Sequence, residues 1–170
     1  MLPAAVRTYA PCGETPELRY RFWDHLSVIS AITPQGKLYT MTQEQAFKGP
    51  DIVRFLKHLL QHISGKLLVV WDRLPAHRGK VVRAFLREGG TKRIHLAQLP
   101  SYAPDLNPDE GVWNYLKRVE LKNVCCHDLH ELRTELRKAI ARLRHKTDII
   151  QGFIRQVYPD VSFRYSCPDQ

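Results

Sequence analysis

The sequence predicts an α/β protein in which helices flank a sheet of mixed strand direction. Two apolar strands joined by Pro34-Gln35-Gly36, a turn with the expected residues, predict an antiparallel hairpin. A short apolar run at 66–71 lies between two amphipathic segments, which is typical of a buried parallel strand. Strands then alternate with helices, a pattern that places helices on the faces of a sheet.

Each expected element follows from its own pattern. The expected strands are short apolar runs, most of them rich in β-branched or aromatic residues: 19–33, 37–42, 66–71 and 94–99. The expected helices repeat apolar residues at intervals of three or four: 50–63, 79–88, a helix that begins at Pro108, and 128–144. The tail at 158–170 has no such period and is expected to be irregular.

Composition narrows the class of protein. The 170 residues suit one domain, and 44% of them are hydrophobic, which is enough for a core. The formal charge of +9, from 26 Lys and Arg against 17 Asp and Glu, favours a polyanionic partner such as nucleic acid; a merely soluble basic protein is the alternative. No apolar run approaches the roughly 18 residues of a membrane span. Four cysteines without zinc spacing fit reduced thiols in a cytoplasm.

The stretch from Leu99 to Lys117 begins as a loop and ends as a helix. Its prolines forbid regular structure as far as Pro108, which itself suits the first position of a helix behind an Asn107 cap. Glu110 then lies in the first turn, near the positive end of the helix dipole. Two interpretations stay open: Glu110 is a site residue, or it closes a capping box with Asn107.

A second carboxylate stands at the end of a strand. Asp72 directly follows the run 66–71, and open α/β sheets place their sites at this end of the strands. Asp72 and Glu110 could share a divalent metal through oxygen ligands. His77 follows within reach of the same edge, where it could contact a phosphate, orient Asp72, or simply bond to the backbone.

These motifs resemble a known family. Asp72-x-x-Pro-Ala-His77, followed by Leu99-Pro-Ser-Tyr-Ala-Pro-Asp-Leu-Asn-Pro-Asp-Glu-Gly-Val-Trp113, resembles the DDE transposases of the mariner superfamily, in particular their bacterial insertion-sequence branch. The resemblance implies a ribonuclease-H-like core, with Asp72 and Glu110 as the second and third catalytic carboxylates. It also implies a two-metal site for Mg²⁺ or Mn²⁺, DNA cleavage and strand transfer at the terminal inverted repeats of a mobile element, and a place beside the bacterial nucleoid.

The family's first carboxylate has no counterpart at the matching position. In the family it lies upstream of an Arg-x-Trp-Ala-Pro segment, which here starts at Arg7, and residues 1–6 contain no Asp or Glu. We therefore expect the chain to lack the family's first strand with its Asp, as well as the amino-terminal helix-turn-helix region. The chain alone should then be inactive. The expected partners are DNA, an upstream polypeptide that carries the missing Asp, and a second copy in a homodimer.

Basic side chains supply candidate DNA contacts. Some lie near the expected site and others on the last predicted helix: His77, Arg78, Lys117, Arg133 and Arg137. A charged helix face is usually only solvated, but the net charge favours contact with the DNA backbone. Two other functions stay open: a non-catalytic DNA-binding or regulatory remnant of a transposase, and another ribonuclease-H-like nuclease such as a resolvase.

Three further features are expected to be structural. His58 and His62 stand one helical turn apart without a third metal ligand nearby, so a solvated face is expected. Asp24 is expected to be a solvated residue at a strand edge. Trp113 is expected to pack in the core rather than stack on a base.

Overall fold

The computed structural model describes residues 12, 25–72, 74, 77, 79–89, 92–101 and 103–159. Within these ranges the chain forms strands, α-helices, one 3₁₀ turn (η3) and one π-helical turn (η4). In chain order they are β1 (Ser27–Ile32), β2 (Leu38–Gln43), α1 (Gly49–His62), β3 (Leu67–Trp71), α2 (Lys80–Arg87), β4 (Ile94–Gln98), η3 (Pro104–Leu106), α3 (Asp109–Tyr115), η4 (Leu116–Glu120), α4 (Leu129–Arg144) and α5 (Thr147–Val157).

The strands form two separate sheets. β1 and β2 pair antiparallel, with Ile32 opposite Leu38. β3 and β4 pair in parallel, with Trp71 opposite Gln98. The sequence predicted one mixed sheet; within the described ranges no hydrogen bonds join the two pairs, so that prediction is corrected to two two-stranded sheets. Each pair therefore keeps strand edges whose backbone groups have no neighbouring strand in the described part of the chain.

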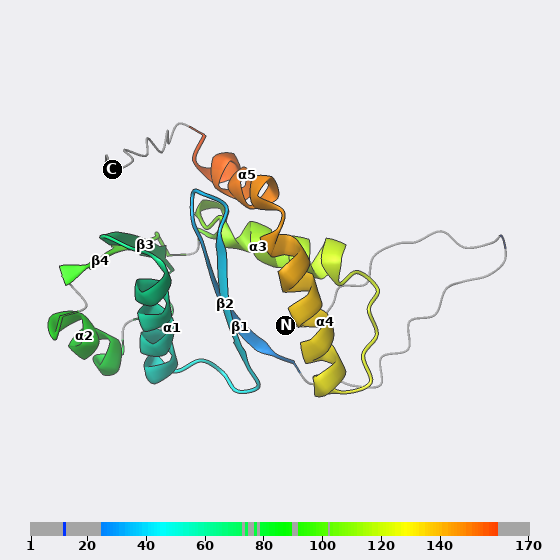
Figure 1. The fold of residues 1–170 in the computed structure, drawn as a ribbon, viewed down its shortest axis with the longest axis horizontal. Helices are drawn as coiled ribbons and strands as arrows, with labels where there is room; N and C mark the ends of the chain where they lie inside the picture. The colour runs from blue at the N-terminus through cyan, green and yellow to red at the C-terminus, as the bar shows by residue number, and fades with distance from the viewer. Residues whose placement is uncertain are drawn as a thin grey trace.

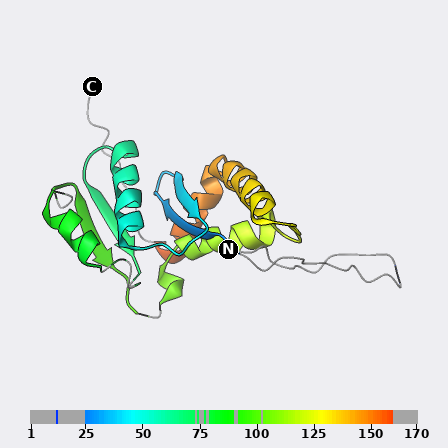
Figure 2. The same cartoon turned by 90° about the horizontal axis from the view of Figure 1, so that it is seen from below.

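The β1–β2 hairpin separates two hydrophobic cores (Figures 1 and 2). The C-terminal core joins the hairpin to α3, η4, α4 and α5; its buried residues are Leu26, Leu38, Val112, Leu116, Leu121, Cys126, Leu132, Leu136, Ala139, Ile140, Leu143 and Ile150. The α1 core joins the hairpin to α1, α2 and the parallel sheet; its buried residues are Ile52, Phe55, Leu56, Leu59, Val82 and Ile94.

Both faces of the hairpin are used because side chains alternate along a strand. Val28 and Ile32 of β1 pack against the C-terminal core. Ile29 and Ala31, which point the other way, pack against the α1 core. The hairpin is thus a shared wall between two helical layers.

The predicted helices form, with ends that differ by about one residue. The helix expected at 50–63 begins at Gly49, where the Lys48 N–H donates to the Asp51 carboxylate at 2.9 Å. The helix expected from 128 begins one residue later, because Asp128 is its N-cap and accepts from the Glu131 N–H at 2.8 Å. All four expected strands are also present. Residues 19–24 of the first expected strand, which include Asp24, lie outside the described residues.

The sequence analysis missed α5, which packs against α3. Gly111 makes this approach close: a Cβ at this position would lie 2.7 Å from the Phe153 ring. The start of α5 also lies against the hairpin turn, where Gly36 has φ +78° and a Cβ would lie 2.6 Å from the Thr147 carbonyl oxygen. Glycine is therefore required at both contacts.

A buried acid fixes η4 to the end of α4. The side chain of Glu120 is only 5% exposed and forms ion pairs at 2.6 Å with Arg142 and with Lys146. Burial alone would raise the pKa of Glu120, but the hydrogen bonds from these two cations outweigh it and lower the pKa. The Lys146 ammonium also donates to the Tyr115 hydroxyl at 3.2 Å. This network holds the segment that follows Glu110 in place.

The remaining expectations concern Trp113, the cysteines, membrane spans and the C-terminal tail. Trp113 packs against the C-terminal core, as predicted. Cys12, Cys125 and Cys126 are free thiols, while Cys167 lies outside the described residues. No helix in the described ranges is both long enough and apolar enough to cross a membrane. The tail from residue 160 onward also lies outside the described residues.

Candidate active site

β3 delivers Asp72 to the carboxyl end of the parallel sheet. The strand is held there because the Leu99 N–H, just after β4, donates to the Trp71 carbonyl oxygen at 2.9 Å. The Asp72 carboxylate is half-exposed and its Oδ1 accepts from the Leu74 N–H at 3.0 Å. That turn fixes one carboxylate oxygen and leaves Oδ2 without a partner among the described residues.

His77 lies directly beside Asp72. Its Nδ1 is 2.9 Å from Asp72 Oδ1, and its ring stacks on the Trp71 indole with centroids 4.6 Å apart and planes 5° apart. The histidine side chain is 12% exposed, against 43% for Asp72, so the imidazole is the better-held member of the pair. His77 Nδ1 also lies 3.3 Å from the Asp72 carbonyl oxygen, so the geometry fits two of the three interpretations, a histidine that orients Asp72 and a histidine that bonds to the backbone.

Glu110 lies in the first turn of α3, which begins at Asp109 rather than at Pro108. The Asn107 side chain accepts from the Asp109 N–H at 3.2 Å, so Asn107 caps the helix as expected of its residue type. The capping box is not formed, because the Asn107 N–H donates instead to the Pro104 carbonyl oxygen at 2.9 Å. The Glu110 side chain is exposed and has no hydrogen-bond or ion-pair partner in the described part of the chain.

The sequence analysis missed a third carboxyl group, that of Asp109. The Ser30 hydroxyl on β1 donates to Asp109 Oδ2 at 2.5 Å, while Oδ1 is buried and has no hydrogen-bond partner. Burial raises the pKa of Asp109 to about 6; the charges of Glu110 and Asp72 act in the same direction, and the hydrogen bond from Ser30 acts against it. Asp109 therefore lies within electrostatic range of both Asp72 and Glu110.

A signal for Asp109 existed in the sequence. It precedes Val112 by three positions and Leu116 by seven, and both of these are fully buried. Residues at this spacing share one helix face, so an Asp at the start of the stripe is expected to point inward. An acidic residue on an apolar stripe, next to a candidate site residue, is the pattern that identifies it.

The donor set suits a hard divalent cation. Asp72 and Glu110 offer carboxylate oxygens that are not engaged by other described residues, and such oxygens are the ligands that Mg²⁺ and Mn²⁺ prefer. Across the described residues no group of three or more His, Cys, Asp or Glu side chains is arranged to hold a metal ion. Asp72 and Glu110 could hold such a cation only together with further ligands.

The other candidate residues lie elsewhere or make other contacts. Lys117 lies in η4, and Arg133 and Arg137 lie on α4, on the far side of the hairpin from β3 (Figure 1). Arg78 lies outside the described residues.

The histidine pair of α1 is arranged as packing. The rings of His58 and His62 have centroids 4.2 Å apart, and both lie near the Tyr39 ring. Burial, followed by the charges of His62 and Arg144, lowers the pKa of His58. The sequence predicted a solvated face; His62 is exposed, whereas His58 is partly buried against the Tyr39 and Phe55 rings.

Asp72 thus stands at the end of a strand, whereas Asp109 and Glu110 stand at the start of a helix. Comparison with known proteins defines the class further. The family model of the DDE superfamily endonucleases matches residues 3–133, so the chain belongs to that family.

Solved structures give the fold. The chain is similar to the Mos1 strand transfer complex (TM-score 0.61, 17% identity, covering 95% of this chain and 52% of that one). It is also similar to the Mos1 transposase paired-end complex with the left transposon end (TM-score 0.61, 16% identity, covering 94% of this chain and 51% of that one). A third similar structure is the Mos1 mariner paired-end complex with Mn (TM-score 0.60, 14% identity, covering 96% of this chain and 53% of that one). The chain thus spans about half the length of these relatives and shares the fold of their ribonuclease-H-like catalytic domain. No curated protein matches it.

Proposed function

We propose that this chain is the catalytic core of a transposase that cuts and rejoins DNA phosphodiester bonds at the ends of a bacterial mobile element. The observation that carries the proposal is the match of the DDE endonuclease family model to residues 3–133, which include Asp72 at the end of β3 and Glu110 in the first turn of α3. The similar Mos1 structures support DNA and a divalent metal as the ligands in this proposal. They are a strand transfer complex and two paired-end complexes, one of them with the left transposon end and another with Mn.

In this proposal Asp72 and Glu110 hold Mg²⁺ or Mn²⁺. When bound, the metal ions would activate the attacking water or 3′-hydroxyl and stabilise the leaving oxygen. The chain's own residues set the geometry. His77 and the Leu74 N–H both contact Oδ1 of Asp72, which leaves Oδ2 as the oxygen available to a metal ion. Ser30 fixes Asp109, and through it the first turn of α3, against β1.

The third ligand is proposed to come from a strand that pairs between β1 and β3. Both sheets leave free edges, and both are covered by the same α1 core, to which Ile29 of β1 and Val69 of β3 each contribute. A strand that carries an Asp at its end, supplied by an upstream polypeptide, would pair with these edges and add the missing carboxylate.

The test is Mn²⁺-dependent nicking of a duplex that contains the element's terminal inverted repeat. The chain alone should be inactive, and mixing it with the polypeptide encoded directly upstream should restore cleavage. In the mixture, Asp72→Asn and Glu110→Gln should each abolish nicking, whereas Asp105→Asn, which removes an exposed carboxylate from the neighbouring η3 turn, should not. Cleavage by the mixture that survives Glu110→Gln would contradict the proposal, and robust cleavage by the chain alone would contradict its incomplete site.

A second candidate function is a DNA-binding remnant without catalysis. The absence of a three-ligand cluster among the described residues favours it. Salt-dependent DNA binding that Asp72→Asn leaves unchanged, with no cleavage in any mixture, would identify this case. Cleavage of branched DNA without preference for element ends would instead identify a resolvase-like nuclease.

A further inference from the structure

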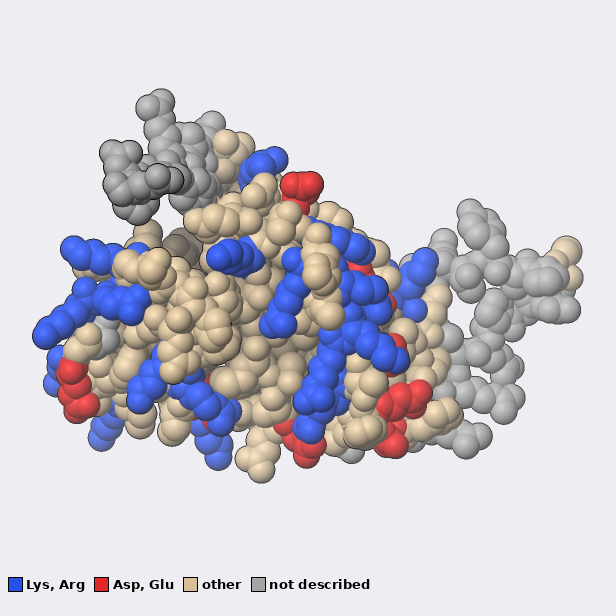
Figure 3. All heavy atoms as spheres, viewed as in Figure 1, with Lys and Arg blue, Asp and Glu red and all other residues tan. Residues whose placement is uncertain are grey.

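The basic residues of α4 are largely engaged within the protein. Three of them form ion pairs: Arg133 with Glu44 at 2.8 Å, Lys138 with Glu135 at 2.8 Å, and Arg142 with Glu120 at 2.6 Å. A fourth, Arg144, donates to the Leu38 carbonyl oxygen and the Thr40 hydroxyl of β2. Figure 3 shows Asp and Glu atoms beside the Lys and Arg atoms in this region. The acids reduce the positive potential that α4 presents to a polyanion.

The basic residues of α2 are free by comparison. Lys80, Arg83 and Arg87 are exposed, and none has a hydrogen-bond or ion-pair partner among the residues that the structure describes. Their spacing of three and then four positions places them on one face of the helix. The helix itself contains no Asp or Glu, and the one acid at its ends is the exposed C-cap residue Glu88, which forms no ion pair with a described residue.

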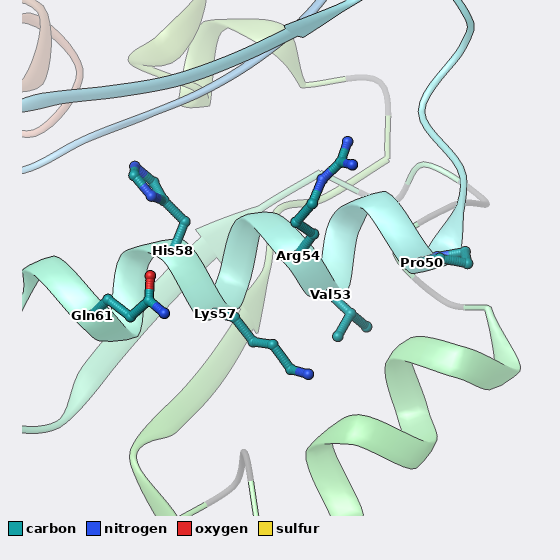
Figure 4. A pocket seen from close by; sticks show the side chains of 6 residues that line it. All are labelled: Pro50, Val53, Arg54, Lys57, His58 and Gln61. Carbon is teal, nitrogen blue, oxygen red and sulfur yellow. The ribbon is translucent and has the colours of Figure 1, made fainter.

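Lys57 extends the basic surface onto α1. Figure 4 shows Lys57 and Val53 on the side of α1 that faces α2, with Arg54 on the opposite side. The Lys57 ammonium lies 5.8 Å from the centroid of the Phe85 ring, a cation–π contact that holds it between the two helices. Arg54 is instead held by Asp51 at 3.2 Å.

This surface adjoins the site. The first turns of α1 and α2 are in contact, since a Cβ at Gly49 would lie 3.5 Å from the Val81 Cβ. α2 is also the element that follows Asp72, so its first residue, Lys80, lies at the end nearer the carboxyl edge of the sheet. The basic residues therefore run from the edge that holds Asp72 toward the far end of α2.

We propose that the α1–α2 surface, formed by Lys57, Lys80, Arg83 and Arg87, binds the sugar-phosphate backbone of the DNA duplex whose cleaved phosphate lies at Asp72. The choice of DNA as ligand rests on the proposed function. The seven-residue rise from Lys80 to Arg87 is about 10 Å, and one strand of a duplex presents a phosphate about every 3.4 Å, so the three α2 cations match about three phosphates. Such contacts position a duplex and carry no sequence information.

The test compares two variants of equal charge by fluorescence anisotropy with a labelled duplex, in EDTA so that no cleavage occurs. The α2 variant is Lys80→Gln, Arg83→Gln and Arg87→Gln. The matched control on α4 is Arg133→Gln, Arg137→Gln and Lys138→Gln. Binding is measured from 50 to 300 mM salt, about the range over which phosphate contacts dominate affinity. Circular dichroism checks that both variants stay folded.

The expected result is a change in salt dependence that is confined to the α2 variant. The slope of log K against log salt should fall in magnitude by about 2.7, which is about 0.9 for each of three lost phosphate contacts, while the α4 control changes it by less than one such contact. Equal losses in both variants, a larger loss in the α4 control, or no binding by the parent chain would overturn the inference. These outcomes are independent of the nicking assay, because Asp72 and Glu110 are intact in both variants.

Discussion

The buried Asp109 carboxyl should make the protein's stability depend on pH in a way that Asp109→Asn removes. Its pKa of about 6 in the folded protein compares with an ordinary value of 3.8, so the folded state holds the proton more tightly than the unfolded state. A group of this kind lowers stability as pH rises through the window between the two values. This difference in pKa lowers the free energy of unfolding by about 3 kcal/mol at pH 8 and by about 1 kcal/mol at pH 4.5.

Urea unfolding of the parent chain and of Asp109→Asn, followed by tryptophan fluorescence in EDTA, measures this difference. The variant should gain stability relative to the parent by about 2 kcal/mol between pH 4.5 and pH 8, whatever its stability at the lower pH. Asp105→Asn controls for the loss of one negative charge near the site. Ser30→Ala should move the parent's window to higher pH, because the Ser30 hydroxyl lowers the pKa of Asp109.

Two outcomes of the unfolding experiment would contradict the raised pKa of Asp109. If the difference between the parent and Asp109→Asn stays constant from pH 4.5 to pH 8, the Asp109 carboxyl does not carry the proton that its burial implies. If Asp109→Asn loses stability as the pH rises, the carboxylate is stabilised by the site rather than destabilised. Either result would refute the electrostatic account of the three carboxyl groups.

Two predictions about packing and one about the ion pairs of Glu120 follow from the same structure. Gly111→Ala should lower the free energy of unfolding by about 1 to 3 kcal/mol because its Cβ would lie 2.7 Å from the Phe153 ring, and Phe153→Leu in the same chain should recover most of the loss in urea unfolding. Gly36→Ala should cost more than Gly65→Ala, since both glycines have φ +78° but only Gly36 meets a carbonyl oxygen; equal melting temperatures would contradict this. Glu120→Gln should cost about 1.5 to 3 kcal/mol at pH 7, and the difference should shrink as the pH falls below the ordinary pKa of the carboxyl, where the parent loses the same two ion pairs.

Much of the fold could be predicted because its signals are local. The turn at Pro34-Gln35-Gly36, the apolar run before Asp72 and the Asp128 cap each specify an element through nearby residues, and each element forms where expected. α5 was missed although Ile150, Ile154 and Val157 recur at helical spacing; what its sequence does not show is the contact with α3, where Gly111 lets the Phe153 ring approach. Nothing in residues 147–157 alone records that contact.

The site also combines residues that the local sequence marks with contacts that it does not show. Asp72 and Glu110 stand at an element's end and start, positions that the sequence marks plainly. The contact between Ser30 and Asp109 joins residues 79 positions apart, so it could not be read from either segment. The free cations of α2 were passed over in favour of Arg133 and the rest of α4, since a sequence does not reveal which charges are already paired.

The shared wall made by the hairpin has a mechanical consequence. Asp72 follows β3, which packs in the α1 core, and Glu110 lies in α3, which packs in the C-terminal core. The hairpin lies between these two cores, so the separation of the two carboxylates depends on how both cores pack against β1 and β2 and not on the interior of either core alone.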